Sequence, residues 1–149
     1  MANYDLIGNI AIVKFKRGAK LSYKKKFALN LLNSHKSVKT VLEKTNKFSG
    51  RLRTQKTKYI AGYKTKEAVY RENACVFRLN VDSCYFSPRL AGERGEIASK
   101  VKKGENVLVL FSGVAPYPIS IAKLSKAARD VSVEIRKECS KYAVENDKL

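Results

Sequence analysis

Cysteine is scarce in this chain, and the few cysteines are not spaced as metal ligands. Cys75, Cys84 and Cys139 are the three that occur among the 149 residues. Their number is odd and no two have the C-x-x-C spacing, which argues against a disulfide framework and against a zinc site. The sequence therefore predicts buried or unreactive thiols and no metal centre.

Long apolar runs are also lacking. No stretch reaches the roughly 18 apolar residues that a membrane-spanning helix needs. The amino terminus has neither the basic start nor the apolar stretch of a secretory signal. Hydrophobic residues nevertheless make up 44% of the chain, which argues against disorder. We expect a folded protein in the cytoplasm that does not enter a membrane.

Acidic residues are few, and the basic ones are concentrated in one part of the chain. There are 31 Lys and Arg against 13 Asp and Glu, a net charge of +18. Residues 1–60 hold 15 of these basic residues and two acids, a net of +13. Such a surface attracts a polyanion, which releases counterions on binding. Acidic lipid or a merely solubilising surface are alternatives, but the concentration of charge favours nucleic acid.

The first two thirds of the chain are predicted to mix strands and helices. Residues 6–15 read as one strand that bends at Gly8. Apolar residues recur at helical spacing over 23–32, and a second helix is expected over 87–102, with Ser87 as its N-cap. The shorter elements expected are strands at 38–42, 59–62 and 77–81 and a basic loop or hairpin at 46–58.

The last third changes character and predicts two parallel strands, each followed by a helix. The apolar runs 107–111 and 131–135 are typical of strands buried on both faces of a parallel sheet, and helices are expected at 118–125 and after Glu138. This β-α-β-α order opens a doubly wound fold. Two parallel strands cannot cover themselves, so we expect further units from elsewhere, for which a separate chain is one source.

The turn after the first of these parallel strands is the leading candidate site. Gly113 has no Cβ to obstruct a ligand, and open α/β sheets bind ligands at the carboxyl ends of their strands. Glu134 follows 21 residues later in the sequence. An acid at about this sequence spacing typically accepts hydrogen bonds from the ribose hydroxyls of a bound nucleoside. A nucleoside cofactor is therefore predicted. The G-x-G-x-x-G pattern is absent, which argues against a dinucleotide.

Two further groups are open to two interpretations. Glu93 beside Arg94 is a candidate base next to an anion clamp, although the residue pattern alone favours a solvated helix face. The second group consists of basic residues interleaved with polar ones: Arg51, Arg53, Lys56 and Lys58. In so basic a segment, phosphate contact is favoured at least as much as a solvated loop.

Several segments together resemble the archaeal and eukaryotic tRNA guanine-37 N1-methyltransferase family, which is related to the wybutosine-pathway aminocarboxypropyl transferase. The resemblance runs along almost the whole chain, and its most specific stretch is 85–94, Tyr-Phe-Ser-Pro-Arg-Leu-Ala-Gly-Glu-Arg. Residues 111–119, Phe-Ser-Gly-Val-Ala-Pro-Tyr-Pro-Ile, resemble the family's Phe-Ala-Gly-Val-Gly-Pro-Phe-Pro-Ile turn. Pro116 favours the methyltransferase over the aminocarboxypropyl enzyme.

The resemblance implies a fold, a reaction and residue roles. The fold would be α/β: a basic α+β RNA-binding subdomain over 1–65, then the first part of a Rossmann-like class I methyltransferase domain over 66–149. The reaction would transfer a methyl group from S-adenosylmethionine to N1 of guanine 37 in tRNA. Glu93 would be the general base and Arg53 would stabilise charge on O6. The implied cofactor-binding residues are Phe111, Gly113, Val114, Pro116 and Glu134. The implied RNA-binding residues are Arg51, Arg53, Lys56, Lys58, Arg89 and Arg94.

The chain departs from the family pattern at several places. Val109 stands where the family usually has Asp, Ala115 replaces the second glycine of the turn, and Arg136 with Lys137 replaces Asn-Pro. The family's later Asn-x-Pro motif would lie beyond Leu149. Three other interpretations therefore stay open: a non-catalytic tRNA-binding fragment, half of a split enzyme completed by a separate chain, and the aminocarboxypropyl transferase.

Overall fold

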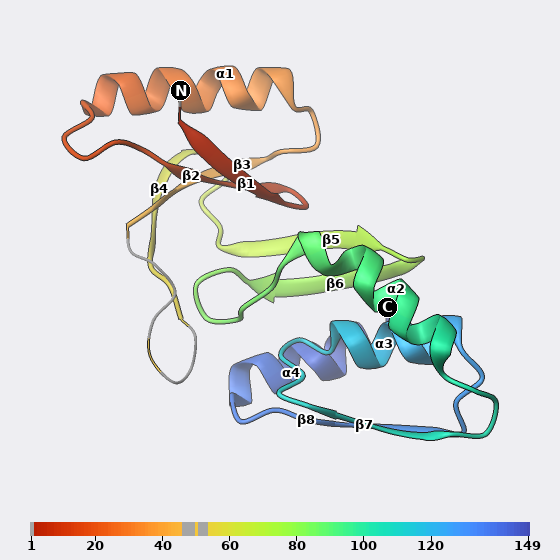
Figure 1. Cartoon of the computed structure of the whole chain (residues 1–149). Helices are drawn as coiled ribbons and strands as arrows, with labels where there is room; N and C mark the ends of the chain where they lie inside the picture. Colours follow the sequence, from red (N-terminus) through yellow and green to blue (C-terminus); the bar gives the residue numbers. More distant parts are fainter. Residues whose placement is uncertain (1, 46–49, 51–53) are drawn as a thin grey trace. The chain divides into compact units, whose positions relative to one another are not determined.

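The computed structural model describes residues 2–45, 50 and 54–149. The chain forms two compact units (Figure 1). The first comprises Met1–Val69 and Asn80–Ser83, and the second comprises Tyr70–Leu79 and Cys84–Leu149. The chain therefore passes to the second unit after Val69, returns to the first over Asn80–Ser83, and then stays in the second unit.

The first unit is built on a four-stranded sheet with the order β1-β2-β3-β4 and one helix. Its elements are β1 Asn3–Ile7, β2 Ile10–Lys14, α1 Leu21–Ser34, β3 Thr40–Lys44 and β4 Thr57–Gly62. β2 and β3 run parallel, with α1 as the connection between them, and the other neighbours are antiparallel. The helix buries Ala28 and Leu31 in one apolar cluster with Val13 and Val41 of the sheet.

The prediction of one bent strand over 6–15 is wrong. Gly8 has a φ of 55°, and with Asn9 it forms a two-residue turn, so that Ile7 pairs with Ile10 across an antiparallel hairpin. A positive φ is accessible to glycine at little cost, which explains the residue at this place. The chain reverses at Gly8, whereas the sequence predicts only a bend there.

The remaining elements include two small sheets, β5 with β6 and β7 with β8. The elements are β5 Glu67–Glu72, β6 Cys75–Asn80, the 3-10 turn η1 Pro88–Leu90, α2 Ala91–Lys100, β7 Asn106–Leu110, α3 Pro116–Leu124, β8 Arg129–Val133 and α4 Lys137–Asn146. Strand β5 was not predicted. Ser87 does stand at the N-cap position of a helical segment that begins with Pro88, but this segment is the 3-10 turn η1, and the Ser87 side chain makes no capping hydrogen bond.

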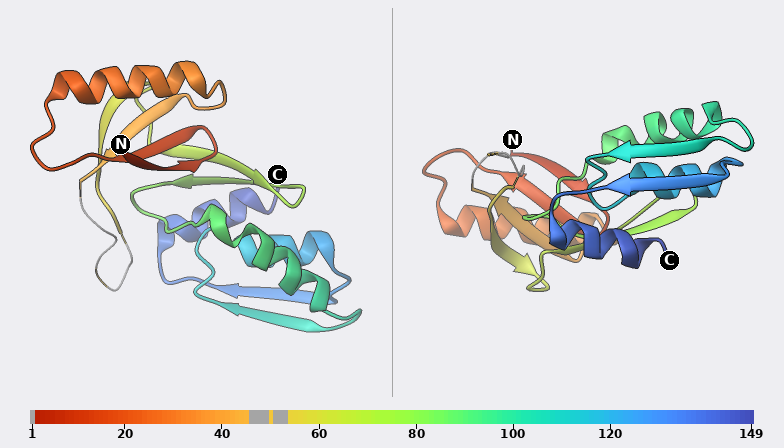
Figure 2. Two further views of the ribbon diagram at one scale, coloured as in Figure 1. Left: turned by 45° about the horizontal axis from the view of Figure 1, so that its top comes forward. Right: turned by 90° about the horizontal axis from the view of Figure 1, so that it is seen from below.

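The predicted β-α-β-α order is confirmed, and β7 and β8 are parallel. Their burial differs from the prediction, because the helices lie on one side of this sheet only (Figures 1 and 2). Leu108 pairs with Val131 and Leu110 with Val133, and all four side chains are 38–61% exposed. We call these four residues the open sheet face.

Neither a membrane-spanning helix nor a metal-binding cluster is found among the described residues. No helix there combines the length and the apolar character that crossing a membrane requires. Nor do three or more His, Cys, Asp or Glu side chains of the described ranges gather as they would around a metal ion.

Candidate active site

The turn between β7 and α3 holds three residues in a left-handed backbone conformation. Phe111, Gly113 and Ala115 have φ values of 56°, 58° and 64°. Glycine adopts such angles without the steric cost of a Cβ, whereas Phe111 and Ala115 are strained. Phe111 is also 87% exposed, while Val114 is fully buried. The segment predicted to bind a cofactor is thus fixed in one shape, with a large apolar ring projecting from it.

Glu134 is brought to this turn by the pairing of β8 with β7. One carboxylate oxygen accepts a hydrogen bond from the Gly113 N–H at 2.9 Å, and the other accepts one from the Arg136 N–H at 2.8 Å. Beside them, the Ser112 N–H donates to the Val133 carbonyl at 3.0 Å. The two candidate cofactor residues that the sequence places 21 positions apart are therefore in direct contact.

An open hollow lies beside Glu134. Its volume is about 560 Å³, within the usual size of small-molecule sites. It is lined by Glu134, Ile135 and residues of α4, whereas none of the turn residues 111–116 lines it. Ile135 and Val144 are 62% and 59% exposed and offer apolar surface to a base. The buried Ser112 hydroxyl has no partner among the described residues and can accept or donate one hydrogen bond. Each carboxylate oxygen of Glu134 keeps a lone pair for a ribose hydroxyl.

The predicted base, Glu93, lies in the first turn of α2 and is exposed. Its Oε1 accepts a hydrogen bond of 2.6 Å from the hydroxyl of Tyr117. Burial, and secondly this contact with Glu93, raise the pKa of Tyr117 to about 12. Glu93 is thus exposed, and its carboxylate has a hydrogen-bond partner.

The neighbouring Arg94 has a different role from the predicted RNA contact. It is 1% exposed, and its guanidinium forms two hydrogen bonds to the buried carboxylate of Glu72. It also donates to the Ser87 carbonyl at 3.1 Å. A guanidinium that is buried and already paired cannot reach a phosphate, so the expectation of an anion clamp at Arg94 does not fit this structure. Its contacts instead tie α2 to β5 and to the segment before η1.

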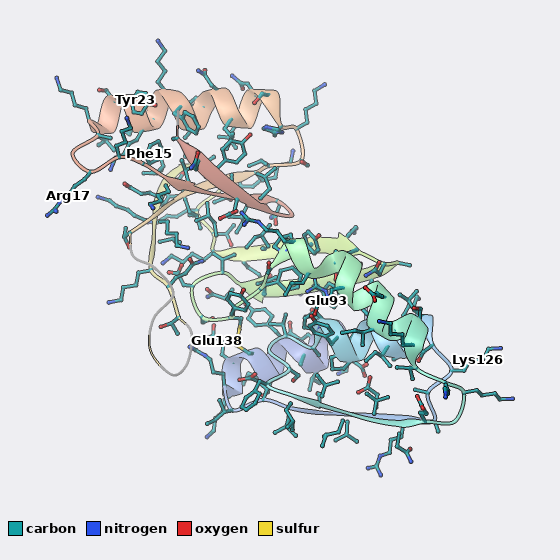
Figure 3. All side chains as sticks on the ribbon, in the orientation of Figure 1. Phe15, Arg17, Tyr23, Glu93, Lys126 and Glu138 are labelled. Carbon is teal, nitrogen blue, oxygen red and sulfur yellow. A yellow bond between two sulfur atoms is a disulfide. The ribbon has the colours of Figure 1, made fainter. Side chains whose placement is uncertain are left out.

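The other predicted RNA-binding residues divide into two groups. Lys56, Lys58 and Arg89 are exposed, as a phosphate contact requires. Arg51 and Arg53 lie outside the described residues, so the predicted stabilisation of O6 by Arg53 has no structural counterpart here. Further positive charge extends to the connection between β2 and α1, where Arg17 points away from the ribbon (Figure 3).

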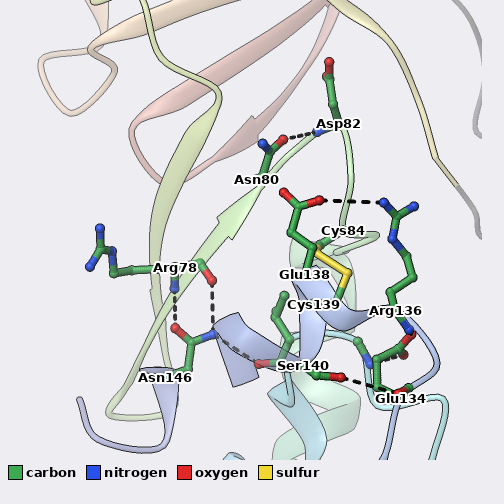
Figure 4. Close-up of a disulfide and its surroundings, with 12 residues drawn as sticks. Arg78, Asn80, Asp82, Cys84, Glu134, Arg136, Glu138, Cys139, Ser140 and Asn146 are labelled. Carbon is green, nitrogen blue, oxygen red and sulfur yellow. Dashed lines mark hydrogen bonds and ion pairs between the residues drawn. A yellow bond between two sulfur atoms is a disulfide. The ribbon is translucent and has the colours of Figure 1, made fainter. Parts of the chain in front are cut away.

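The cysteine prediction needs correction. Cys84 and Cys139 form a disulfide across 55 residues of sequence, whereas Cys75 is a free, buried thiol. The bond joins the segment that leads into η1 to the first turns of α4 (Figure 4). An odd count and the absence of C-x-x-C spacing therefore excluded a framework of several bridges, but they did not exclude a single bridge between distant residues.

Sequence reasoning also missed Asn146, which connects the turn to β6. This residue is 2% exposed. Its side-chain oxygen accepts from the Arg78 N–H at 2.7 Å, and its amide donates to the carbonyls of Arg78 and Val114, both at 3.1 Å (Figure 4). An asparagine in the last turn of a helix carries no sequence signal for such a bridge. It holds the Val114 carbonyl of the turn, whereas Glu134 holds the Gly113 N–H.

Comparison with known families assigns both parts of the sequence. Residues 68–149 match the TRM5/TYW2 methyltransferase domain, and residues 1–65 match the TYW2 N-terminal domain. A relative from Nanoarchaeum equitans, the tRNA (guanine(37)-N(1))/4-demethylwyosine(37)-methyltransferase Taw22, is 42% identical over 147 residues. The match covers 99% of this chain and 48% of that protein, so the chain spans about half the length of this relative.

Solved structures agree with the sequence comparison. The crystal structure of Trm5b from Pyrococcus abyssi aligns with a TM-score of 0.85 and 38% identity, covering 98% of this chain and 43% of that one. Trm5 from Methanocaldococcus jannaschii, in complex with adenosine, aligns with a TM-score of 0.82 and 25% identity, covering 99% and 43%. The similarity therefore extends over both units of the chain.

Proposed function

Because the chain belongs to the TRM5/TYW2 methyltransferase family, we propose that it takes part in transferring a methyl group from S-adenosylmethionine to N1 of guanine 37 in tRNA. The observation that supports the proposal is the hydrogen bond between Gly113 and Glu134, which brings two predicted cofactor residues together at the carboxyl ends of β7 and β8. The cofactor residues are Phe111, Gly113, Val114, Pro116 and Glu134. When bound, S-adenosylmethionine supplies an electrophilic methyl group.

The chain's own contribution to the chemistry is proton transfer and charge stabilisation. N1 of guanine is weakly acidic, so its methylation requires a base, and the exposed carboxylate of Glu93 is suited to accept that proton. Removal of the proton places negative charge on O6, and Arg53 is proposed to stabilise it. Both residues act on the base, whereas Gly113 and Glu134 act on the cofactor.

The tRNA is proposed to bind mainly through positive charge. Residues 1–60 carry a net charge of +13, and Lys56, Lys58 and Arg89 are exposed. Together with Arg51 and Arg53 they would contact phosphates, which position a nucleic acid without reading its sequence. Access to tRNA in the cytoplasm is part of this proposal.

A completing polypeptide is also part of the proposal, because the open sheet face needs a cover. Parallel sheets are stable when both faces are covered, and two strands alone are marginal. The residues of the open sheet face are exposed, and helices lie on one side of this sheet only. The relatives described above are about twice as long as this chain. The proposed occupant is the remaining part of a family methyltransferase domain, which adds strands to this sheet and helices to this face.

Co-purification tests this docking. The probe is the part of Pyrococcus abyssi Trm5b that follows the segment matched by this chain, co-expressed with it. We expect the two to co-elute, and Leu108→Lys to abolish co-elution. Leu21→Lys, at an exposed leucine of α1, is the matched control and should co-elute normally. Self-association of the chain through Leu108, with no binding of the probe, would show instead that a second copy covers this face.

One substrate variation has a specific observation in its favour. The Taw22 relative is named for methylation of both guanine 37 and 4-demethylwyosine 37, so 4-demethylwyosine in tRNA is a second candidate acceptor. The aminocarboxypropyl transferase remains an alternative, and the match of residues 1–65 to a TYW2 N-terminal domain is consistent with it. A non-catalytic tRNA-binding fragment is the third candidate.

A single-turnover assay with excess protein and unmodified tRNA transcript tests the proposed function. The chain is assayed with the completing polypeptide, and Glu93→Gln is expected to lower the rate by roughly 100- to 10,000-fold with little change in tRNA affinity. Glu96→Gln, one helical turn further along α2, is the control and should leave the rate unchanged. Near-normal transfer by Glu93→Gln would remove Glu93 as the base. Absence of transfer by the unmodified chain would favour the tRNA-binding fragment.

A further inference from the structure

A short hydrogen bond joins the two helices that carry the proposed base and the cofactor turn. Tyr117 is the second residue of α3, directly after the turn, and Glu93 lies in the first turn of α2. The tyrosine hydroxyl donates to Glu93 Oε1 at 2.6 Å. Hydrogen bonds to a carboxylate are shorter and stronger than neutral ones. The contact therefore restricts the rotamers of an otherwise exposed glutamate.

The tyrosine ring is itself held in place by buried groups. The guanidinium of Arg94 lies 5.7 Å from the Tyr117 ring centroid and 5.1 Å from that of Phe86. Arg94 is fixed in turn by its two hydrogen bonds to Glu72, whose side chain is 5% exposed. The Tyr117 ring therefore packs against a guanidinium that a buried ion pair holds in place.

The hydroxyl keeps its proton over the working pH range. Burial is the main cause that raises the pKa of Tyr117 to about 12, and the hydrogen bond to Glu93 adds to it. Tyr117 therefore acts as a donor to the carboxylate and does not compete with it for a proton.

We propose that Tyr117 is a positioning residue for Glu93, holding Oε1 so that Oε2 is presented to the N1 proton of the target base. This rests on the proposed function, because it assumes that Glu93 accepts that proton. Because the hydroxyl orients the base through Oε1 and is not itself the proton acceptor, its effect is expected to adjust the rate rather than to determine whether the reaction occurs.

A double-mutant cycle tests this role in the chain completed by the Trm5b probe. Tyr117→Phe should lower the single-turnover rate about tenfold, while the Kd for tRNA and the melting temperature stay close to normal. In the Glu93→Gln background the same substitution should have no further effect, because Tyr117 acts only through Glu93. Tyr63→Phe, at a tyrosine that is 71% exposed, is the matched control and should change neither rate.

Phenol absorbance of the chain alone tests the contact without any assay of activity. The absorbance transition at the highest pH, which we assign to Tyr117, should be absent from Tyr117→Phe. It should move to lower pH in Glu93→Gln and stay unchanged in Tyr63→Phe. An unchanged last transition in both site variants would overturn the contact. Normal methyl transfer with additive effects of the two substitutions would overturn the positioning role alone. A completed chain without methyl transfer would overturn the proposed function and the positioning role together.

Discussion

The carboxylate of Glu134 accepts the Gly113 N–H at 2.9 Å, so the acid at the end of β8 fixes the turn at the end of β7. The spacing of these residues predicted that both face one ligand. The structure adds that they also bind each other, which gives Glu134 two tasks. It holds the backbone of the turn and still offers lone pairs to a ribose.

Glu134→Ala should destabilise the fold as well as the site. Its two hydrogen bonds to backbone N–H groups are charge-assisted, and such bonds contribute about 1.5–3 kcal/mol to the free energy of unfolding. Urea denaturation measures the loss. Glu138→Ala is the control, because its side chain is 45% exposed and its ion pair with Arg136 is 3.7 Å long, so a loss below about 1 kcal/mol is expected. Equal losses in the two variants would contradict the bracing role of Glu134.

Ala115→Gly should be tolerated although the residue is buried. Its φ of 64° costs an L-residue about 1–2 kcal/mol, and glycine relieves that strain while losing about 0.8 kcal/mol for one buried methyl group. The free energy of unfolding should therefore change little or rise slightly, whereas Ala98→Gly, at a fully buried alanine in the last turn of α2, should lower it by about 1–2 kcal/mol. Chemical denaturation of both variants provides the comparison.

The same variant also bears on the cofactor. Binding of S-adenosylmethionine to the isolated chain is expected to be weak, because Ala115 replaces a glycine of the family turn and helices lie on one side of the sheet only. Calorimetry should show tighter binding to Ala115→Gly than to the unmodified chain. Micromolar affinity of the unmodified chain would mean that neither the Ala115 methyl group nor the open sheet face weakens cofactor binding.

Reduction of the disulfide should lower stability strongly. Cys84 and Cys139 are 55 residues apart, and the chain-entropy model assigns a loop of that size about 4 kcal/mol. A reductant should therefore lower the melting temperature of the unmodified chain, but not that of the Cys84→Ser, Cys139→Ser double variant. Disulfides are rare in a reducing cytoplasm, so a melting temperature that ignores reductant would indicate two free thiols in solution.

Periodic elements of the fold were predictable, and the irregular ones were not. α1 and the β7-α3-β8-α4 order follow from apolar spacing, which local sequence determines. Strand β5 reads Glu-Ala-Val-Tyr-Arg-Glu, with a short apolar stretch between charged ends, so the sequence carried no clear strand signal. The hairpin at Gly8 could not be distinguished from a single bent strand, because both of its strands are apolar and the turn between them has only two residues.

The candidate site was predictable where it depends on spacing and unpredictable where it depends on packing. Gly113 and Glu134 were found because a strand-turn-helix unit repeats at a fixed distance. The burial of Arg94 was missed, because its partner Glu72 lies 22 residues earlier in another element. Tyr117 and Asn146 were missed for the same reason, since a hydrogen bond between elements has no local sequence pattern.

Asp130→Asn should stabilise the chain near neutral pH. Both carboxylate oxygens of Asp130 are buried and lack a partner among the described residues. Burial, and secondly Asp147, raise its pKa. The folded state therefore binds this proton more tightly than the unfolded chain, and the corresponding stability is lost as pH rises from the unfolded value of about 3.9 through the raised one.

Urea denaturation at several pH values measures this effect. As pH rises through the raised pKa of Asp130, the unmodified chain should lose stability relative to Asp130→Asn. The two proteins should have similar stability at lower pH, where the Asp130 carboxyl is protonated in the folded and the unfolded chain. Glu145→Gln, at an exposed acid of α4, is the control and should follow the unmodified chain. Parallel curves for Asp130→Asn and the unmodified chain would show that a solvent or partner group satisfies this carboxylate.

Binding of tRNA by the first unit should depend strongly on salt, because residues 1–60 carry a net charge of +13. Each phosphate contact that is lost should flatten the plot of log affinity against log salt by about 0.7–0.9. Lys58→Ala should therefore weaken binding and flatten this slope, since the side chain is exposed on β4. Lys100→Ala is the matched control, because that lysine lies on α2 and pairs with Glu96 at 2.6 Å.

Filter binding with an unmodified transcript, and with duplex DNA as competitor, measures the affinity for tRNA and its salt dependence. Salt-independent affinity would exclude phosphate contacts as its source, and equal competition by duplex DNA would show that the basic surface does not select tRNA.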